Sequence, residues 1–243
     1  ALNQNITFTQ PDDMEFGDPD AQLTFSASSE LPVTVESDTT SVCTVSGAAV
    51  SIVAVGRCEL TASQAGDSRY AAASSVTRSF DIRPALATAP TISSVSAGSG
   101  EITVSFTEPG FDGGVDIDAY ELVATPTGAG DVVTDSFCPS WPCTIDNLVN
   151  GTEYTVTIAA INAAGTGPAS LPSPALTPFT NAQAVRGLVG VPGDESLMVS
   201  WGEITDGALG GGTFTGYQVT LTGGSAPVVE TITDRQTIDH SFD

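Results

Sequence analysis

Short runs of alternating apolar and polar residues follow one another along the whole chain. Ile102, Val104 and Phe106 alternate with polar residues, and Tyr154 begins a similar run. A period of two places such side chains on one face of a β-strand. Gly, Pro, Asp and Ser separate the runs, as they do in tight turns. The pattern predicts an all-β fold with no significant helix.

One set of these runs occurs twice. The first copy contains Ile102, Val104, Phe106, Tyr120, and then Thr144, Ile145 and Asp146. The second contains Leu197, Val199, Trp201, Tyr217, and then Thr237, Ile238 and Asp239, at offsets of 95, 97 and 93 residues. A repeat of this length indicates tandem small domains. The first copy then continues as LVNGTEYTVTIAAINAAGTGP, whereas the second stops at Asp243.

Prolines mark the expected domain boundaries. The chain of 243 residues has room for two to three domains of about 100 residues. We expect domains at residues 1–84, 85–178 and 179–243. The segment PALATAP (84–90) predicts a short, stiff linker, because proline fixes its own φ and restricts the residue before it.

The first domain contains seven short runs between Asn5 and Ile82 that are typical of a β sandwich. It resembles the bacterial immunoglobulin-like repeats of large surface proteins. The residues that carry this resemblance are the turn Phe16-Gly17-Asp18, Leu31-Pro32-Val33, the hairpin Val45-Ser46-Gly47, Gly56, and the ending from Ala62 to Tyr70. The resemblance implies an immunoglobulin-like sandwich.

The second and third domains resemble fibronectin type III domains, which are Greek-key β sandwiches. In the second domain the most specific residues are Leu148, Asn150, Gly151, Thr152, Glu153 and Tyr154, followed by Asn162, Gly165 and Gly167. The resemblance implies that the Tyr154 hydroxyl ties back to the preceding corner. It places Phe106 and Trp201 at the position where the family commonly has tryptophan, and Tyr217 on the next core strand.

The third domain is expected to lack its last two strands, because its sequence has no counterpart of Tyr154. Without them we expect Trp201, Tyr217, Val219 and Leu221 to face solvent and the fragment to be unstable alone. Either longer native sequence or a strand from a neighbouring chain would have to complete it.

Charge narrows the range of partners. The chain has 29 acidic residues, six Arg and no Lys, and its formal charge is −23. The three domains carry 11 acids with four Arg, 10 acids with no base, and eight acids with two Arg, hence −7, −10 and −6. Nucleic acid is excluded as a partner because phosphate binding requires clustered Lys or Arg. The distributed charge is typical of a solubilising surface.

Four cysteines form two local pairs, Cys43 with Cys58 and Cys138 with Cys143. Even, local pairing without a CxxC motif predicts disulfides and an oxidising compartment. We expect the first pair to join neighbouring strands. No apolar run approaches the roughly 18 residues needed to cross a bilayer, so no membrane insertion is predicted. The expected location is extracellular or at a cell surface.

The loop Phe137-Cys138-Pro139-Ser140-Trp141-Pro142-Cys143 is the most distinctive local feature. Its disulfide would hold Trp141 at or near the tip of a pre-organised hairpin, and a rigid aromatic side chain loses little entropy on binding. Two interpretations stay open. Trp141 either folds over the sheet and protects an edge, or it contacts a neighbouring domain, a glycan or a protein.

Catalytic chemistry has little support, and we predict no enzyme and no cofactor. The single histidine, His240, is interpreted as an exposed strand-end residue, and the glycine-rich stretches Gly128–Gly130 and Gly207–Gly212 as hairpin turns or loops. Calcium is the one metal worth weighing, since it prefers carboxylate and carbonyl oxygens. The weak candidates are Asp12, Asp13, Glu15, Asp18 and Asp20, with a rival run at Asp112, Asp116 and Asp118.

Together these observations predict a non-enzymatic extracellular segment of a bacterial surface protein or surface filament. It would act as a stalk, spacer, adhesion or assembly module whose partner is a protein, a glycan or another copy of itself. The alternative is an accessory glycan-binding or spacer region of a secreted polysaccharide-degrading enzyme. A strip of exposed aromatics on one sheet would favour that alternative.

Overall fold

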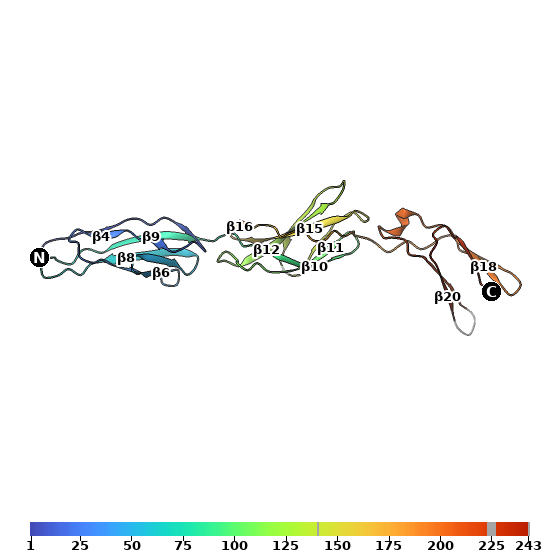
Figure 1. Cartoon of the computed structure of the whole chain (residues 1–243), viewed down its shortest axis with the longest axis horizontal. Coiled ribbons are helices and arrows are strands. Elements are labelled where there is room, and N and C mark those ends of the chain that lie inside the picture. The colour runs from blue at the N-terminus through green and yellow to red at the C-terminus, as the bar shows by residue number, and fades with distance from the viewer. Residues whose placement is uncertain (140, 223–226, 243) are drawn as a thin grey trace.

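The chain folds as a row of three small β domains placed end to end. The computed structural model describes residues 1–139, 141–222 and 227–242. Figure 1 shows the N-terminus at the far end of the first domain and the C-terminus in the third, so the domains follow one another along the long axis. No helix among the described residues is long and apolar enough to cross a membrane.

The first domain contains strands β1 to β9. They are β1 (Ile6–Phe8), β2 (Met14–Glu15), β3 (Ala21–Gln22), β4 (Phe25–Ala27), β5 (Thr34–Ser37), β6 (Cys43–Ser46), β7 (Ala49–Ile52), β8 (Gly56–Ser63) and β9 (Val76–Arg83). They form sheets of order β2-β9-β8-β5 and β3-β7-β6, with a separate β1-β4 pair. The core contains Phe8, Val50, Leu60, Phe80 and Ile82.

The disulfide of the first domain joins its two sheets. Cys43 lies on β6 and Cys58 on β8, which belong to different sheets, and both residues are fully buried. The pairing predicted from the sequence is present, but the expectation of neighbouring strands is wrong. Because the bond passes through the core, it holds the two layers of the sandwich together.

The second domain has the most complete sandwich. Its strands are β10 (Thr91–Ala97), β11 (Ile102–Thr107), β12 (Ile117–Pro126), β13 (Val133–Cys138), β14 (Cys143–Ile145), β15 (Tyr154–Asn162) and β16 (Gly165–Thr166). One sheet has the order β10-β11-β14 and the other β13-β12-β15-β16. Gly128–Gly130 lies between β12 and β13, in the hairpin connection that the sequence predicts.

Alternation along β11, β12 and β15 supplies the core of this domain. Ile102, Val104, Leu122, Val156 and Ile158 are fully buried. Phe106 and Tyr120 pack edge to face, with ring centroids 4.5 Å apart. Tyr154 is also buried, and its hydroxyl oxygen accepts a hydrogen bond from the Val149 N–H at 3.2 Å. That bond is the tie to the preceding corner that the resemblance implies.

A serine- and proline-rich run completes the edge beside β15. Ser170 and Ser173 are buried, and their hydroxyl oxygens accept hydrogen bonds from the N–H groups of Ile158 and Val156 at 3.1 and 2.9 Å. Their own N–H groups donate to the carbonyls of the same two residues. The prolines among them interrupt a regular strand because proline has no N–H and a fixed φ, and the serine hydroxyls take the place of absent ladder partners.

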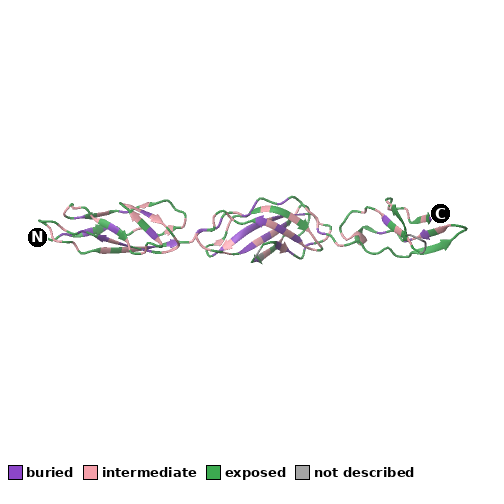
Figure 2. Cartoon of the chain, turned by 90° about the horizontal axis from the view of Figure 1, so that it is seen from below, coloured by how far each residue is buried: buried purple, intermediate pink, exposed green. Residues whose placement is uncertain are grey.

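The third domain has fewer strands and a smaller core. It contains β17 (Val189–Pro192), β18 (Leu197–Ser200), the short 3-10 helix η1 (Asp206–Leu209), β19 (Tyr217–Leu221), β20 (Val228–Ile232) and β21 (Asp239–Phe242). The sheets are β17-β18-β21 and the hairpin β19-β20. In Figure 2, much less of this domain is drawn in purple, the colour of buried residues, than of the other two domains.

Two aromatic residues of the third domain are buried, contrary to expectation. Trp201 and Tyr217 are 5% and 6% exposed, and Phe214 packs on Tyr217. The Tyr217 hydroxyl accepts from the Ile204 N–H and donates to the Arg235 carbonyl, both at 3.1 Å. The loop after β18 therefore folds back over these rings. Val219 and Leu221 are only partly covered.

Strand pairing also corrects the alignment of the two repeats. In the second domain Ile102 pairs with Ile145, and in the third Leu197 pairs with Phe242. Phe242 therefore corresponds to Ile145, at an offset of 97 residues, and Ile238 precedes the strand. The similar letters Thr-Ile-Asp had suggested an offset of 93, because so short a run cannot fix a register by itself.

Candidate functional site

The disulfide loop of the second domain presents an exposed aromatic residue. Cys138 ends β13 and Cys143 begins β14, so their bond also joins the two sheets. Trp141 is 60% exposed and Phe137 is 72% exposed. Most of the Trp141 side chain is therefore in water, which favours the contact interpretation over a ring that protects the sheet edge. Ser140 lies outside the described residues.

Phe137 was not singled out from the sequence, and simple alternation would not have found it, because the pairing of β12 with β13 shifts register between Tyr120 and Leu122. Cys138 is buried and pairs with Tyr120 on β12, so its neighbour Phe137 points to the opposite, outer face of β13. A flat aromatic ring in this position can stack on a sugar or enter a pocket of a protein, because burying it removes a large apolar area from water.

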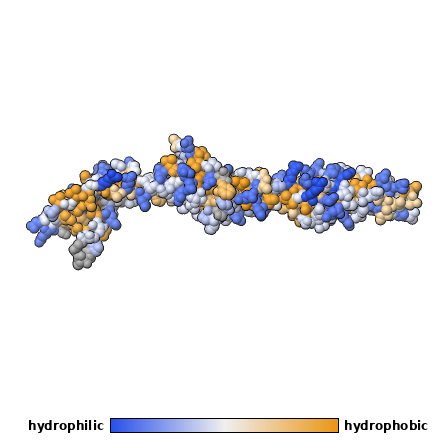
Figure 3. Space-filling view, turned by 180° about the vertical axis from the view of Figure 1, so that it is seen from behind, coloured by the Kyte–Doolittle hydropathy of each residue, from blue (hydrophilic) through white to orange (hydrophobic). Residues whose placement is uncertain are grey.

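An apolar groove opens between the two sheets of the third domain. It measures about 390 Å³, and its lining includes Val185, Leu188, Leu197, Val219, Leu221 and Phe242. Its walls include residues of β18 and β19, and Figure 3 shows hydrophobic side chains gathered over this domain. In the second domain, β12 pairs with β13 on one edge and with β15 on the other. Among the residues that the structure describes, β19 pairs with β20 on one edge and with no strand on the other.

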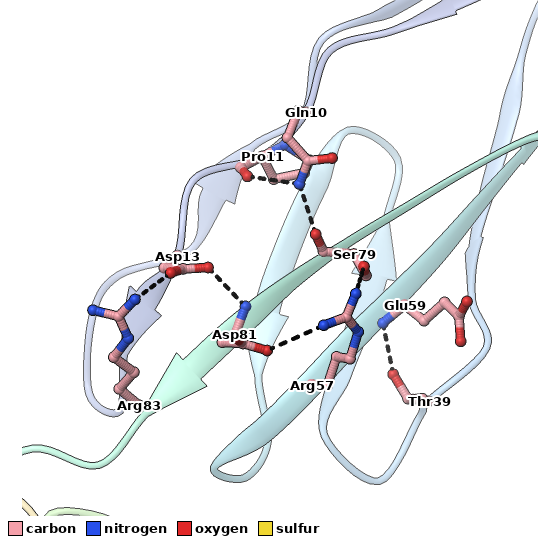
Figure 4. Close-up of polar contacts among 9 residues, drawn as sticks. All are labelled: Gln10, Pro11, Asp13, Thr39, Arg57, Glu59, Ser79, Asp81 and Arg83. Atoms are coloured by element: carbon pink, nitrogen blue, oxygen red, sulfur yellow. Dashed lines mark hydrogen bonds and ion pairs between the residues drawn. The ribbon is translucent and has the colours of Figure 1, made fainter.

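The acidic residues of the first domain serve its own structure. Figure 4 shows Asp13 paired with Arg83 and accepting the Asp81 N–H, while Asp81 also faces Arg57. The Asp18 carboxylate accepts the Glu15 N–H at 2.8 Å and so closes a turn. Such exposed ion pairs contribute little to stability, about 0–1 kcal/mol.

Neither acidic run forms a cation site. Across the described parts of the chain, no three His, Cys, Asp or Glu side chains gather where they could hold a metal ion. Asp12, Asp13, Glu15, Asp18 and Asp20 are close in sequence, but the Arg83 guanidinium already neutralises Asp13. In the rival run, Asp112 accepts the Gly114 N–H within its own loop. The calcium set suggested by the sequence does not fit this geometry.

Three further titratable residues, His240, Tyr120 and Asp67, interact with other residues of the fold. His240 lies within β21 and not at an exposed strand end, and its ring meets Phe242 edge to face at 5.0 Å. Burial, and then the charge of Glu108, raise the pKa of Tyr120. The backbone N–H groups of Tyr70 and Arg69 lower the pKa of Asp67 by hydrogen bonding to its carboxylate.

The arrangement of the second domain agrees with a comparison to protein families. Residues 88–175 match the family model of the Fibronectin type III domain. These residues contain the Tyr154 corner and both sheets of the second domain. Domains of this family are commonly structural or adhesion modules.

Comparison with solved structures finds other rows of small β domains. Domains A168–A170 of titin are 18% identical over 72% of this chain, with a TM-score of 0.39, and the match spans 65% of the titin fragment. Domains FN1–FN3 of chicken CNTN1 are 14% identical, with a TM-score of 0.37, over 98% of this chain and 87% of that one. Because both TM-scores are below 0.5, no function is transferred from these proteins.

Proposed function

We propose that this segment is a non-enzymatic extracellular spacer, a stalk-like part of a surface protein or surface filament that holds other modules away from their attachment point. The supporting observation is the arrangement of three domains in series along one axis (Figure 1). Both disulfides join the sheets of a sandwich, which suits an oxidising exterior. The net charge of −23 keeps neighbouring copies apart. The resemblance of the first domain to bacterial immunoglobulin-like repeats favours a bacterial source.

A reach assay tests the spacer function. The chain is placed between a cell-surface anchor and a binding head, and a Gly/Ser linker of equal residue number serves as the control. A flexible coil extends only with the square root of its length, so the folded row should let the head capture an immobilised ligand at greater separation. Equal reach for the two linkers would contradict the proposal.

A second candidate function is contact with a glycan or a protein through the disulfide loop. The exposure of Trp141 and Phe137 favours it, because the domain leaves both rings in water. In this case the segment would be an adhesion module, or the accessory region of a polysaccharide-degrading enzyme. Phe179 is the other large aromatic residue that is exposed in the described part of the chain, so one small contact patch is favoured.

Binding to insoluble polysaccharides and to a glycan array tests the second function. Trp141→Ala should abolish retention without lowering the melting temperature, whereas Val132→Ala, another exposed apolar residue near β13, should change neither. Loss of stability in Trp141→Ala would instead mean that the ring serves the fold. Equal retention of the wild type and Trp141→Ala would reject a role of the loop in binding.

A further inference from the structure

Both junctions between domains are built from the same hydrogen bonds. In the first, the Ala85 and Thr88 N–H groups donate to the carbonyls of Gly113 and Phe111 at 3.0 and 2.9 Å. In the second, the Thr180 and Gln183 N–H groups donate to the carbonyls of Gly210 and Ala208 at 2.7 and 2.8 Å. The donors are 95 residues apart and the acceptors 97, which are the offsets of the repeat itself. The junction is therefore part of the repeated unit.

The acceptors lie in one loop, between β11 and β12 in the second domain and between β18 and β19 in the third. Each loop contains a pair of glycines with positive φ, at +83° and +81° for Gly113 and Gly114 and +65° and +90° for Gly210 and Gly211. Glycine adopts such angles without the steric cost that a side chain brings.

Close approach also explains why both members of each pair are glycines. A Cβ on Gly113 would lie 1.9 Å from the Ala85 carbonyl oxygen, and one on Gly210 would lie 2.5 Å from the Thr180 oxygen, so the first glycine meets the linker in both junctions. A Cβ on Gly114 would lie 2.4 Å from the Phe16 ring. Phe16 belongs to the preceding domain.

The second glycine of the third domain has the same role. A Cβ on Gly211 would lie 2.5 Å from the backbone nitrogen of Gly151, which belongs to the preceding domain. In each junction the first glycine thus leaves room for the linker, and the second leaves room for the preceding domain. The sequence suggested only a hairpin turn or loop for Gly207–Gly212. This stretch does lie in the loop between β18 and β19, and it also contains part of η1 and the domain contact.

The first junction carries additional contacts. The Phe16 and Phe111 rings stack at 5.9 Å with planes 16° apart. The Asn162 side-chain amide donates to the carbonyls of Ala85 and Asp112 at 2.8 and 2.7 Å. In the second junction, Ala208 stands where Phe111 stands in the first and offers no ring.

We propose that this glycine-pair loop is a docking surface for the preceding domain and its linker, and that it fixes the angle between consecutive domains. The first junction is the stiffer of the two because it adds the ring stack and the Asn162 bonds. This inference goes beyond the proposed spacer function, since a spacer could equally have flexible joints.

Residual dipolar couplings on the full chain test the proposal, with matched alanine variants in each loop. Gly114→Ala is compared with Gly110→Ala, and Gly211→Ala with Gly207→Ala, because Gly110 and Gly207 have nothing within 4 Å of an added Cβ. We expect the first two wild-type domains to share one alignment tensor and Gly114→Ala to give each domain its own, with Gly110→Ala unchanged. For the second junction we expect Gly211→Ala, but not Gly207→Ala, to change the orientation of the third domain.

A further variant separates domain orientation from damage to the loop, because alanine at a positive φ also strains its own domain. Phe111→Ala leaves the backbone alone, and Phe111 is not a member of the domain core. We expect it to change the relative orientation while the couplings within each domain still fit their own structures. Independent tensors in the wild type would overturn the proposal. A single shared tensor in both Gly114→Ala and Phe111→Ala would also overturn it.

Discussion

The second and third domains begin with the same repeat and end with very different cores. Ile102 and Leu122 are fully buried in the second, while their counterparts Leu197 and Val219 are only partly covered. The strands that contain Ile102 and Leu197 pair in the same way in both domains, β11 with β14 and β18 with β21. The difference teaches that local alternation specifies strands, whereas burial of their inner face depends on β15, which arrives later in the sequence.

The third domain covers part of its core with the loop between β18 and β19, which is longer than the loop between β11 and β12 in the second domain. Arg235 donates from its guanidinium to the Ile204 carbonyl, and Tyr217 binds both of these residues through its hydroxyl. This network covers the end of the sandwich at which the Trp201 and Tyr217 rings pack together. It does not reach Val219 and Leu221, which line the open groove.

Adding an equivalent of β15 to the third domain should have the largest effect. Residues 146–178 of the second domain are appended after Phe242, the position that corresponds to Ile145. If β15 is what closes the core, amide hydrogen exchange in β19 should slow by roughly 100-fold, equivalent to about 2.7 kcal/mol. A scrambled tail of the same composition is the control. Equal exchange with the two tails would show that the groove is closed by something other than this pattern.

A matched truncation in the two cores should give an effect of comparable size. Ile102→Ala removes a fully buried side chain and should cost the second domain about 2–5 kcal/mol. Leu197→Ala at the equivalent site should cost the third domain less than about half of that, because solvent already reaches the side chain. Exchange protection of each domain, measured in the intact chain, checks both. Similar losses at the two sites would contradict the comparison.

The sequence predicted those features that depend on neighbouring residues or on strong spacing. The strands, both disulfides and the Tyr154 corner follow from alternation, local cysteine pairs and a short motif. The burial of Trp201 was missed because this ring packs on Tyr217, whose hydroxyl is bound to Ile204 and Arg235, and no periodic pattern marks those two residues. The calcium suggestion failed because proximity in sequence does not make carboxylates converge, and Asp13 already has an arginine partner.

The two equivalent tyrosines should respond in opposite directions to loss of their hydroxyl groups. Tyr217→Phe leaves the Ile204 N–H and the Arg235 carbonyl unpaired and should cost about 1–3 kcal/mol. Among the described residues the buried Tyr120 hydroxyl has no hydrogen-bond partner, so Tyr120→Phe should be neutral or stabilising by up to about 1 kcal/mol. Denaturant titration followed by exchange in each domain measures both. A clear loss in Tyr120→Phe would reveal a partner for that hydroxyl.

The smallest expected effect is an alkaline loss of stability confined to the second domain. Burial, followed by the charge of Glu108, raises the pKa of Tyr120 above its ordinary value of 10.0. The unfolded chain therefore releases this proton at a lower pH than the folded domain does. The stabilising contribution is complete below about pH 10 and is lost as the pH rises through the higher folded pKa. Unfolding titrations between pH 9 and 11.5 should show this decline in the wild type and a shallower one in Tyr120→Phe, and parallel curves would show that another group causes the decline.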